Sequence, residues 1–232
     1  MLVHAAGSTA GMWRRQLDGL GERHSALAVD LPGHGRSGGL EGLPTIEAYA
    51  DWLARFLIVV RERPFVLVGR SMGGVIGLVL AARHASALRG LVLVCSAARF
   101  TLTAETIDGV RDVVRGRQPQ QFGTETFSPT TPLDLMKEAW MEQVRTDPRV
   151  RLGDLLACQA FDGRDLLARV RVPTLVVAGS DDQITPVAQS EDLARGIAGA
   201  RLEVIAQAGH QAPLEQTAMF NRLVTEFAEA IA

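Results

Sequence analysis

Short apolar runs separated by helical patterns recur along this chain of 232 residues and limit the folds it can adopt. The runs are rich in Val, Leu and Ile, and they do not alternate with polar residues. Strands that are buried on both faces of a parallel sheet have this pattern. The runs predict strands over residues 1–3, 25–29, 65–68, 91–94, 174–178 and 202–205.

Helical patterns fit between these runs, over residues 11–20, 46–61, 72–84, 186–197 and 213–231. Strands and helices in alternation are typical of a sheet with helices on both faces. We therefore expect the α/β class, with a doubly wound, mostly parallel sheet of about six strands.

The alternation breaks between residues 99 and 169, where polar helical segments surround a proline-containing loop at residues 127–132. This stretch is too long for a simple connection. We expect a helical lid over the strand ends, although a helical decoration with no role in substrate access would have the same pattern. The predicted organisation is a core of residues 1–98 and 170–232 and a lid of residues 99–169.

A serine stands at the apex of a predicted strand-turn-helix, in the sequence Gly-Arg-Ser-Met-Gly-Gly of residues 69–74. Glycine two residues before and after Ser71 permits a tight turn, because no side chain separates the strand from the helix. This context predicts that Ser71 is a nucleophile. The alternative is an ordinary glycine-rich turn.

A serine nucleophile needs a base to accept its proton and an acid to orient that base. In α/β sheets these groups gather beyond the carboxyl ends of the strands. Of the five histidines, His210 directly follows the last predicted strand, so we expect it to be the base. His34 lies in a glycine-rich loop and could be structural or line the site. Asp181 and Asp182 follow the strand at 174–178, and both are candidates for the acid.

The tetrahedral intermediate of such a reaction carries an oxyanion that needs N–H donors. One predicted donor is the backbone amide of Met72, which follows the nucleophile at the start of a helix. The second should come from the small-residue loop after the first strand, and Ala6 is our choice there.

Composition excludes several other classes of function. The net charge is −2, from 24 basic and 26 acidic residues, and no basic cluster points to nucleic acid. The longest apolar stretch, residues 72–82, is too short to span a membrane, and no signal peptide is visible. Cys95 and Cys158 lack metal-type spacing, so we expect two core thiols, a cytoplasmic protein, no metal and no cofactor.

Over its whole length the chain resembles the α/β-hydrolase superfamily, in the lidded branch with esterases, enol-lactonases, haloperoxidase-like enzymes and carbon–carbon hydrolases. Four motifs carry the resemblance: residues 4–8 (His-Ala-Ala-Gly-Ser), 30–37 (Asp-Leu-Pro-Gly-His-Gly-Arg-Ser), 69–74, and 179–182 with 209–210. Residues 146–162 look like the lid of bacterial esterases in this branch. The family pattern implies Asp182, rather than Asp181, as the acid. A serine at residue 71 counts against haloalkane dehalogenases, which have aspartate there.

The chain departs from this family pattern in three places. Ala5 replaces a glycine of the oxyanion loop. Arg70 stands where His, Asn or an aromatic residue is more familiar; it could bind an acidic substrate group or, as we favour, pair with a lid carboxylate. The family normally has two strands before this loop, so the strand at 25–29 should be a sheet edge. We expect that edge to be covered by the early helix or by a partner chain in a homodimer.

The resemblance and the motifs together predict a serine carboxylesterase that hydrolyses small to medium esters through an acyl-enzyme. Aromatic residues are few, at 5%, so aliphatic side chains and Met should line the acyl pocket, with Phe127, Trp140 and Phe161 as further substrate-binding walls. One alternative is a lactonase, an enol-lactonase or a hydrolase of a dicarboxylate metabolite, supported by Arg70. Another is a ligand-sensing protein with slow turnover, because fold does not fix function.

Overall fold

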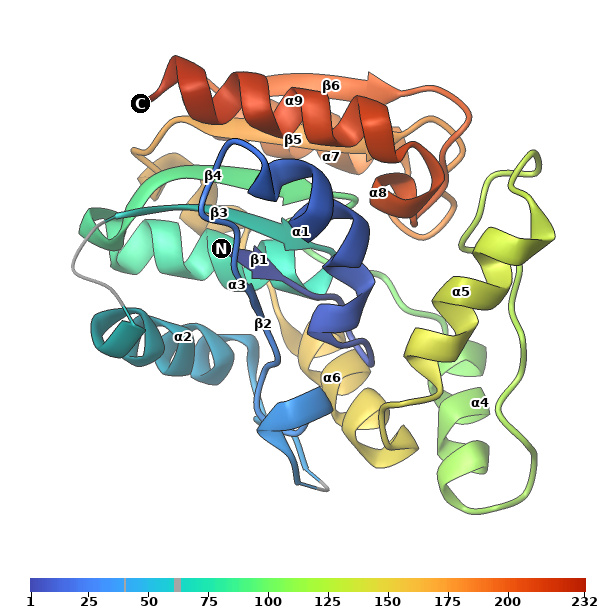
Figure 1. The fold of residues 1–232 in the computed structure, drawn as a ribbon. Helices are drawn as coiled ribbons and strands as arrows, with labels where there is room; N and C mark the ends of the chain where they lie inside the picture. The colour runs from blue at the N-terminus through green and yellow to red at the C-terminus, as the bar shows by residue number, and fades with distance from the viewer. Residues whose placement is uncertain (40, 61–63) are drawn as a thin grey trace.

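The structure is a computed structural model that describes residues 1–39, 41–60 and 64–232. Its centre is a six-stranded sheet in the order β2-β1-β3-β4-β5-β6, and every neighbouring pair is parallel (Figure 1). The strands are β1 (Leu2–Val3), β2 (Ala28–Val29), β3 (Phe65–Arg70), β4 (Leu88–Val94), β5 (Thr174–Gly179) and β6 (Arg201–Ile205). The expected α/β class and six-stranded parallel sheet are therefore confirmed.

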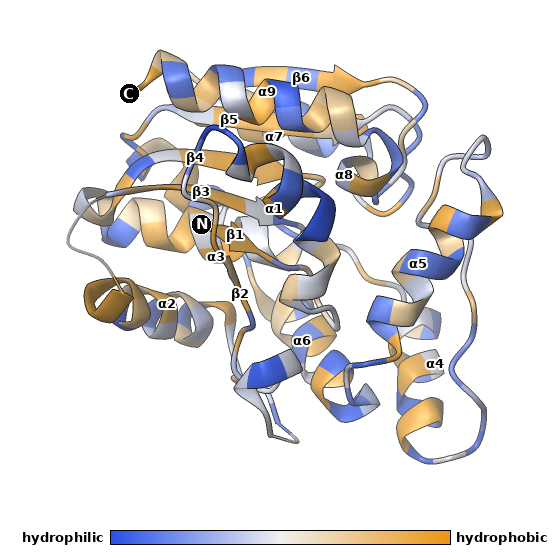
Figure 2. Cartoon of the chain, in the orientation of Figure 1, coloured by the Kyte–Doolittle hydropathy of each residue, from blue (hydrophilic) through white to orange (hydrophobic). Residues whose placement is uncertain are grey.

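Both faces of the sheet are covered by apolar side chains, because neighbouring residues of a strand point to opposite faces. Leu67 and Leu91 belong to one buried cluster, whereas their neighbours Val68 and Val92 belong to the other. Figure 2 shows hydrophobic colouring along β3 and β4. Burial on two sides explains why these runs lack the polar alternation of a half-exposed sheet.

Helices form a layer on each face of the sheet. The first cluster includes side chains from α2 (Ile46–Val60), α3 (Met72–Arg83) and α7 (Val187–Gly196). The second cluster includes side chains from α1 (Arg14–Gly21) and α9 (Thr217–Ala230), which pack against each other. Trp13 and Phe220 stack there with ring centroids 6.1 Å apart. Arg61, the expected last residue of the second helix, lies outside the described residues.

The last predicted helix is divided in two, which corrects the expectation of one helix over residues 213–231. A short α8 (Ala212–Glu215) ends at Gln216, whose φ of −127° and ψ of 53° are not helical, and α9 begins at Thr217. The Gln216 side chain donates to the Gln207 carbonyl at 3.1 Å. Glu215 accepts hydrogen bonds from the nearby Gly209 amide and from the distant Ser128 amide, so contacts with two loops fix this turn.

β2 is an edge strand, as expected, because it pairs only with β1 in this sheet. The 3₁₀ helix η1 (Ala10–Trp13) contacts it, and the Ala10 amide donates to Asp30 just beyond β2 at 2.7 Å. The early helical segment therefore packs beside the edge. A homodimer that covers this edge stays a prediction.

The stretch between β4 and β5 is helical and stands apart from the sheet (Figure 1). It contains α4 (Ala104–Val114), α5 (Leu133–Gln143), α6 (Pro148–Ala160) and the 3₁₀ helix η4 (Arg164–Arg169). Arg99 and Asp162 form an antiparallel bridge at its base, and η4 packs back against α3 and α7.

Cys95 and Cys158 are free and buried, as expected. No helix of the described residues has the length and hydrophobicity to cross a membrane.

Candidate active site

Ser71 lies in a sharp turn between β3 and α3, with φ of 52° and ψ of −114°. The turn is tight enough that a Cβ on Gly69 would lie 2.1 Å from the Gly73 carbonyl oxygen. The Ser71 amide donates to the Val94 carbonyl at 2.9 Å, and the Ser96 hydroxyl donates to the Ser71 carbonyl at 2.9 Å. The end of β4 and the loop that follows it therefore hold the backbone of this turn.

The two amides predicted to bind an oxyanion lie on elements that pack closely together. Met72 is the first residue of α3, where helix geometry leaves the N–H without an intrahelical acceptor. A Cβ on Gly73 would lie 2.4 Å from the Val3 carbonyl oxygen and 2.7 Å from that of His4. This close approach brings the loop containing Ala6 next to the start of α3, and Ala6 and Ser71 line the same cavity.

His210 and Asp182 form a hydrogen-bonded pair beyond the ends of β6 and β5. His210 Nδ1 lies 2.9 Å from Asp182 Oδ2. Asp182 also accepts hydrogen bonds from the Ile184 amide at 2.8 Å and from the Thr185 amide and hydroxyl at 2.9 and 2.8 Å. Burial raises the pKa of Asp182, but the hydrogen bonds and charge of His210 and the bonds from Thr185 outweigh it, so the pKa lies below its usual value. This carboxylate stays ionised at neutral pH.

The other candidate acid, Asp181, faces away from His210. Its carboxylate accepts hydrogen bonds from the Ser128 and Ser180 hydroxyls at 2.6 and 2.8 Å. Of the two adjacent aspartates, the structure therefore brings Asp182 to the histidine, in agreement with the family pattern.

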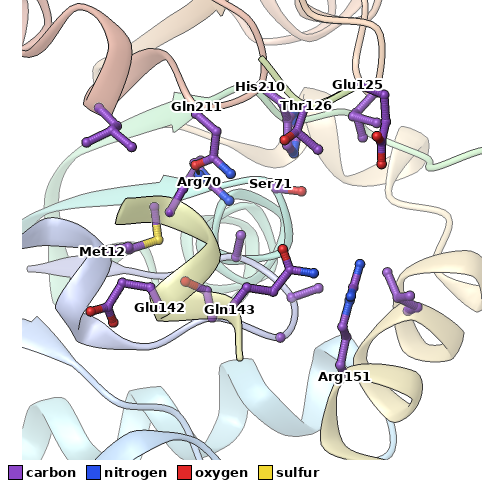
Figure 3. A pocket seen from close by; sticks show the side chains of 18 of the residues that line it. Met12, Arg70, Ser71, Glu125, Thr126, Glu142, Gln143, Arg151, His210 and Gln211 are labelled. Atoms are coloured by element: carbon purple, nitrogen blue, oxygen red, sulfur yellow. Dashed lines mark hydrogen bonds between the residues drawn. The ribbon is translucent and has the colours of Figure 1, made fainter. Parts of the chain in front are cut away.

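Ser71 and His210 face one cavity of about 430 Å³ (Figure 3). Among the described residues no hydrogen bond joins the Ser71 hydroxyl to the His210 ring. Such contacts are often loose before substrate binds and tighten in the reacting complex. The His210 amide donates to the Thr126 carbonyl at 2.8 Å, so the loop before α5 helps to position the histidine.

The cavity lies between the loops at the strand ends and the insertion. Its apolar walls are aliphatic and Met side chains with one aromatic ring: Met12, Phe100, Leu102, Met141, Leu155, Ile184 and Leu214. The structure places Phe127, Trp140 and Phe161 outside this lining. Phe161 is buried in the core cluster with α3, and Trp140 packs edge-on against Phe122 at 5.7 Å. The aliphatic walls agree with the sequence analysis, whereas these three aromatic walls do not.

Arg70 also faces the cavity, but it has no lid carboxylate as a partner within the described chain. Its Nη1 instead donates to Gln211 Oε1, beside His210. The expected ion pair with the lid is therefore wrong. Two residues that sequence reasoning missed stand out here: Gln211, which directly follows the predicted base, and Arg151 of α6, which points toward Ser71 (Figure 3).

Sequence reasoning also missed a buried cluster around Asp154 of α6. Its carboxylate accepts hydrogen bonds, each 2.8 Å long, from His34 Nε2, the Tyr49 hydroxyl and the Gly7 amide. His34 is thus structural, one of the two options left open for it. The cluster ties the insertion to the loop that carries Ala6. The only signal in the sequence is an acidic residue on the buried side of a predicted lid helix.

The Cys95, Asp182 and His210 side chains have ligand atoms within 4.8 Å of one another, as a metal site would require. A metal binds the thiolate form of cysteine. Burial raises the pKa of Cys95, and its thiol donates to the Gly209 carbonyl at 3.7 Å. The Asp182 oxygens are already engaged by Thr185, Ile184 and His210. These donors fit a hydrogen-bonded cluster better than a metal centre.

Comparisons with known proteins agree with this arrangement. Residues 1–223 match the model of the alpha/beta hydrolase family. A pimeloyl-acyl-carrier-protein methyl ester esterase from Neisseria meningitidis is 30% identical over 99% of this chain and 93% of its own length. A malate-bound thermophilic esterase from Thermogutta terrifontis has a TM-score of 0.85 at 27% identity, covering 99% of this chain and 89% of that one.

The enol-lactonase from Burkholderia xenovorans LB400 has a TM-score of 0.81 at 26% identity, covering 98% of this chain and 90% of that one. The similarity thus extends from the first strand to the last helix in every case. The chain is a hydrolase and belongs to the alpha/beta hydrolase family.

Proposed function

We propose that this protein is a serine carboxylesterase that acts on small to medium esters. The observation that carries the proposal is the buried Asp182–His210 pair at a cavity that Ser71 also faces. An ionised carboxylate on Nδ1 leaves Nε2 of the neutral ring to act as a base. The similarity to two esterases along nearly the whole chain supports ester hydrolysis as the reaction.

In the proposed first half-reaction the Ser71 hydroxyl attacks the acyl carbon of the ester. His210 Nε2 accepts the hydroxyl proton, while Asp182 holds Nδ1 and stabilises the imidazolium. The carbonyl oxygen becomes an oxyanion, which the amides of Met72 and Ala6 stabilise. The intermediate collapses by breaking the bond to the alcohol, which leaves with the proton from His210 and gives an acyl-enzyme.

In the second half-reaction water attacks the acyl carbon and gives its proton to His210. The bond to the Ser71 oxygen breaks, the serine takes the proton back, and the acid leaves. Small residues in the loop of residues 5–8 allow the backbone to approach the acyl group closely. The aliphatic cavity walls favour short acyl chains over bulky aromatic ones.

Hydrolysis of p-nitrophenyl acetate and butyrate tests this proposal. We expect Ser71→Ala to lower kcat by about 10³-fold or more, because it removes the oxygen that is proposed to form the acyl-enzyme. Ser86→Ala, at an exposed serine in the short 3₁₀ helix that follows α3, is the matched control and should keep full activity. A fluorophosphonate probe should label the peptide containing Ser71. Full activity in Ser71→Ala would show that the nucleophile is another residue.

A second candidate function is lactone hydrolysis by the same steps. It is favoured by the similarity to an enol-lactonase along 98% of this chain. In a lactone the leaving alcohol stays attached to the acyl group. These two activities can be separated by measuring kcat/KM for enol-lactones and for p-nitrophenyl esters in the same preparation. The favoured substrate class should have a kcat/KM about tenfold or more higher than the other.

A further inference from the structure

The Arg70 side chain is buried beside the nucleophile with too few partners for its charge. Only 6% of the residue is exposed. Its Nη1 donates to the neutral Gln211 side chain, and its Nε has no hydrogen-bond partner in the structure. The guanidinium lines the cavity that Ser71 faces (Figure 3).

A buried cation with one neutral partner is costly, because burial removes its water without supplying an opposite charge. This cost is visible in the pKa of Arg70, which burial lowers to about 10. Asp182 and Glu215 are the carboxylates whose charge acts on the pKa of Arg70, but both bind other groups. Asp182 binds His210 and Thr185, and Glu215 accepts from the amides of Ser128 and Gly209. Arg70 therefore retains a donor group and a charge that the protein itself does not satisfy.

The other charged groups around the cavity leave a second unpaired guanidinium. Glu138 pairs with Arg15 at 2.7 Å, and Glu142 pairs with Arg145 at 2.6 Å. Arg151 forms no ion pair with a described residue, and the exposed Glu125 is the one carboxylate that influences its pKa. Cations therefore exceed anions among the groups that the cavity exposes to a ligand.

Arg151 is held in place so that it points into the cavity. Its side chain crosses over Gly7, where an added Cβ would lie 2.6 Å from Arg151 Cγ. The Gln143 amide oxygen, in the orientation its neighbours favour, accepts from Arg151 Nη2 at 2.9 Å. Burial lowers the pKa of Arg151, as it does for Arg70. Figure 3 shows Arg70 and Arg151 approaching the space around Ser71 from different sides.

We propose that Arg70, supported by Arg151, forms a carboxylate-binding subsite, and that the substrates are short esters or lactones that carry a free carboxylate. This inference rests on the proposed function for its substrate class. A guanidinium binds a carboxylate through two parallel N–H bonds, and the interaction strengthens where water is excluded. A cavity of about 430 Å³ with aliphatic walls holds a few methylene groups between the carboxylate and the acyl carbon.

Binding to an inactive protein tests the subsite without requiring turnover. Glutarate is titrated into Ser71→Ala by isothermal calorimetry, with glutaramide as the neutral probe of the same shape. We expect glutarate to bind about tenfold or more tightly than glutaramide, because each charge-assisted hydrogen bond contributes more than a neutral one. Adding Arg70→Gln should weaken glutarate binding about tenfold or more. Adding Arg164→Gln, which removes an exposed arginine that pairs with Asp162 outside the cavity, should leave it unchanged.

Kinetics give the second readout. Monomethyl glutarate and methyl butyrate are compared as substrates of wild type and Arg70→Gln. We expect the variant to lose about tenfold or more in kcat/KM for the charged ester, mainly through KM, with little change for the neutral ester. Arg151→Gln should show a smaller loss of the same kind.

The outcomes separate this inference from the proposed function. Equal binding of glutarate and glutaramide to Ser71→Ala, or equal glutarate binding with and without Arg70→Gln, would overturn the subsite. If Arg70→Gln does not fold, inhibition of wild-type ester hydrolysis by glutarate is compared with inhibition by glutaramide. Equal inhibition by the two compounds would overturn the proposed carboxylate subsite. Full esterase activity in Ser71→Ala would instead overturn the proposed nucleophile, and the binding titration would still report on Arg70.

Discussion

The backbone of Ser71 is held in a region of φ and ψ that favours glycine. Such a conformation costs a non-glycine residue about 1–3 kcal/mol. Ser71→Gly should therefore relieve strain, although glycine also gains about 0.5–1 kcal/mol of freedom in the unfolded chain. We expect Ser71→Gly to be about 1 kcal/mol more stable than wild type and inactive toward esters, with a thermal melting temperature raised by a few degrees.

Ser71→Ala is the control for this comparison, because alanine keeps the Cβ and so keeps the strain. Its melting temperature should stay close to that of wild type while its activity is lost. A lower melting temperature for Ser71→Gly than for Ser71→Ala would show that the turn is not strained at this residue.

At the same scale, the sequence predicted which residues meet but not all of their contacts. Ser71, Asp182 and His210 each follow a strand of one parallel sheet, so topology alone brings them to one edge. The partner of Arg70 could not be predicted in this way. Gln211 meets it across 141 residues of sequence, and no local pattern encodes that pairing. From the sequence, Phe161 could equally be a pocket wall or a core residue. The structure buries it in the core cluster with α3.

Among the elements, α6 is the one that joins the insertion to the loop with the predicted oxyanion donor. Asp154 makes this connection, because its carboxylate accepts hydrogen bonds from the Gly7 amide, the His34 ring and the Tyr49 hydroxyl. We expect Asp154→Asn to lower the free energy of unfolding by about 2–4 kcal/mol, because a buried ionic cluster loses its only carboxylate. It should also lower kcat more than it raises KM, since Asp154 positions the loop without touching substrate.

Urea denaturation and ester kinetics on the same variant check both parts of this prediction. Asp162→Asn removes an exposed carboxylate that pairs with Arg164, so its stability should stay close to that of wild type. Unchanged kcat in a destabilised Asp154→Asn would restrict Asp154 to a role in folding.

The elements themselves were largely predictable from the sequence. Four of the five helical patterns and all six strands occur near their expected positions, because hydrophobic periodicity reports burial directly. The break at Gln216 was not predictable, since the neighbouring Glu215 binds Ser128, which lies 87 positions away in the sequence. The cluster of Asp154 with His34 joins residues 120 positions apart, which periodicity cannot detect.

For the molecule as a whole, two adjacent buried histidines in opposite charge states link stability to pH. The rings of His4 and His34 lie 4.6 Å apart. His4 Nε2 accepts from the Leu31 amide at 3.1 Å, so this ring is neutral, and burial lowers its pKa to about 4. Both nitrogens of His34 face acceptors, the Pro32 carbonyl and Asp154, so this ring is charged. Burial lowers the pKa of His34, but the bond and charge of Asp154 outweigh it and raise the pKa overall.

These opposite shifts predict a stability maximum near pH 6.5. In the unfolded chain His4 gains a proton below pH 6.5, whereas in the folded protein it gains one only near pH 4. The contribution of His4 to the free energy of unfolding therefore falls by about 3 kcal/mol between pH 6.5 and pH 4. Above pH 6.5 unfolded His34 is neutral while the folded ring is still charged. The His34 contribution is therefore complete below pH 6.5 and is lost as pH rises through its folded pKa.

Urea denaturation of wild type, His4→Gln and His34→Gln at pH 4.5, 6.5 and 8.5 measures the two arms of this profile separately. His4→Gln should flatten the fall toward low pH, because glutamine can still accept from the Leu31 amide but does not titrate. His34→Gln should flatten the fall toward high pH. His84→Gln, at an exposed histidine, should follow wild type at all three pH values. Parallel profiles for wild type and His4→Gln would mean that other groups, carboxylates above all, cause the loss of stability in acid.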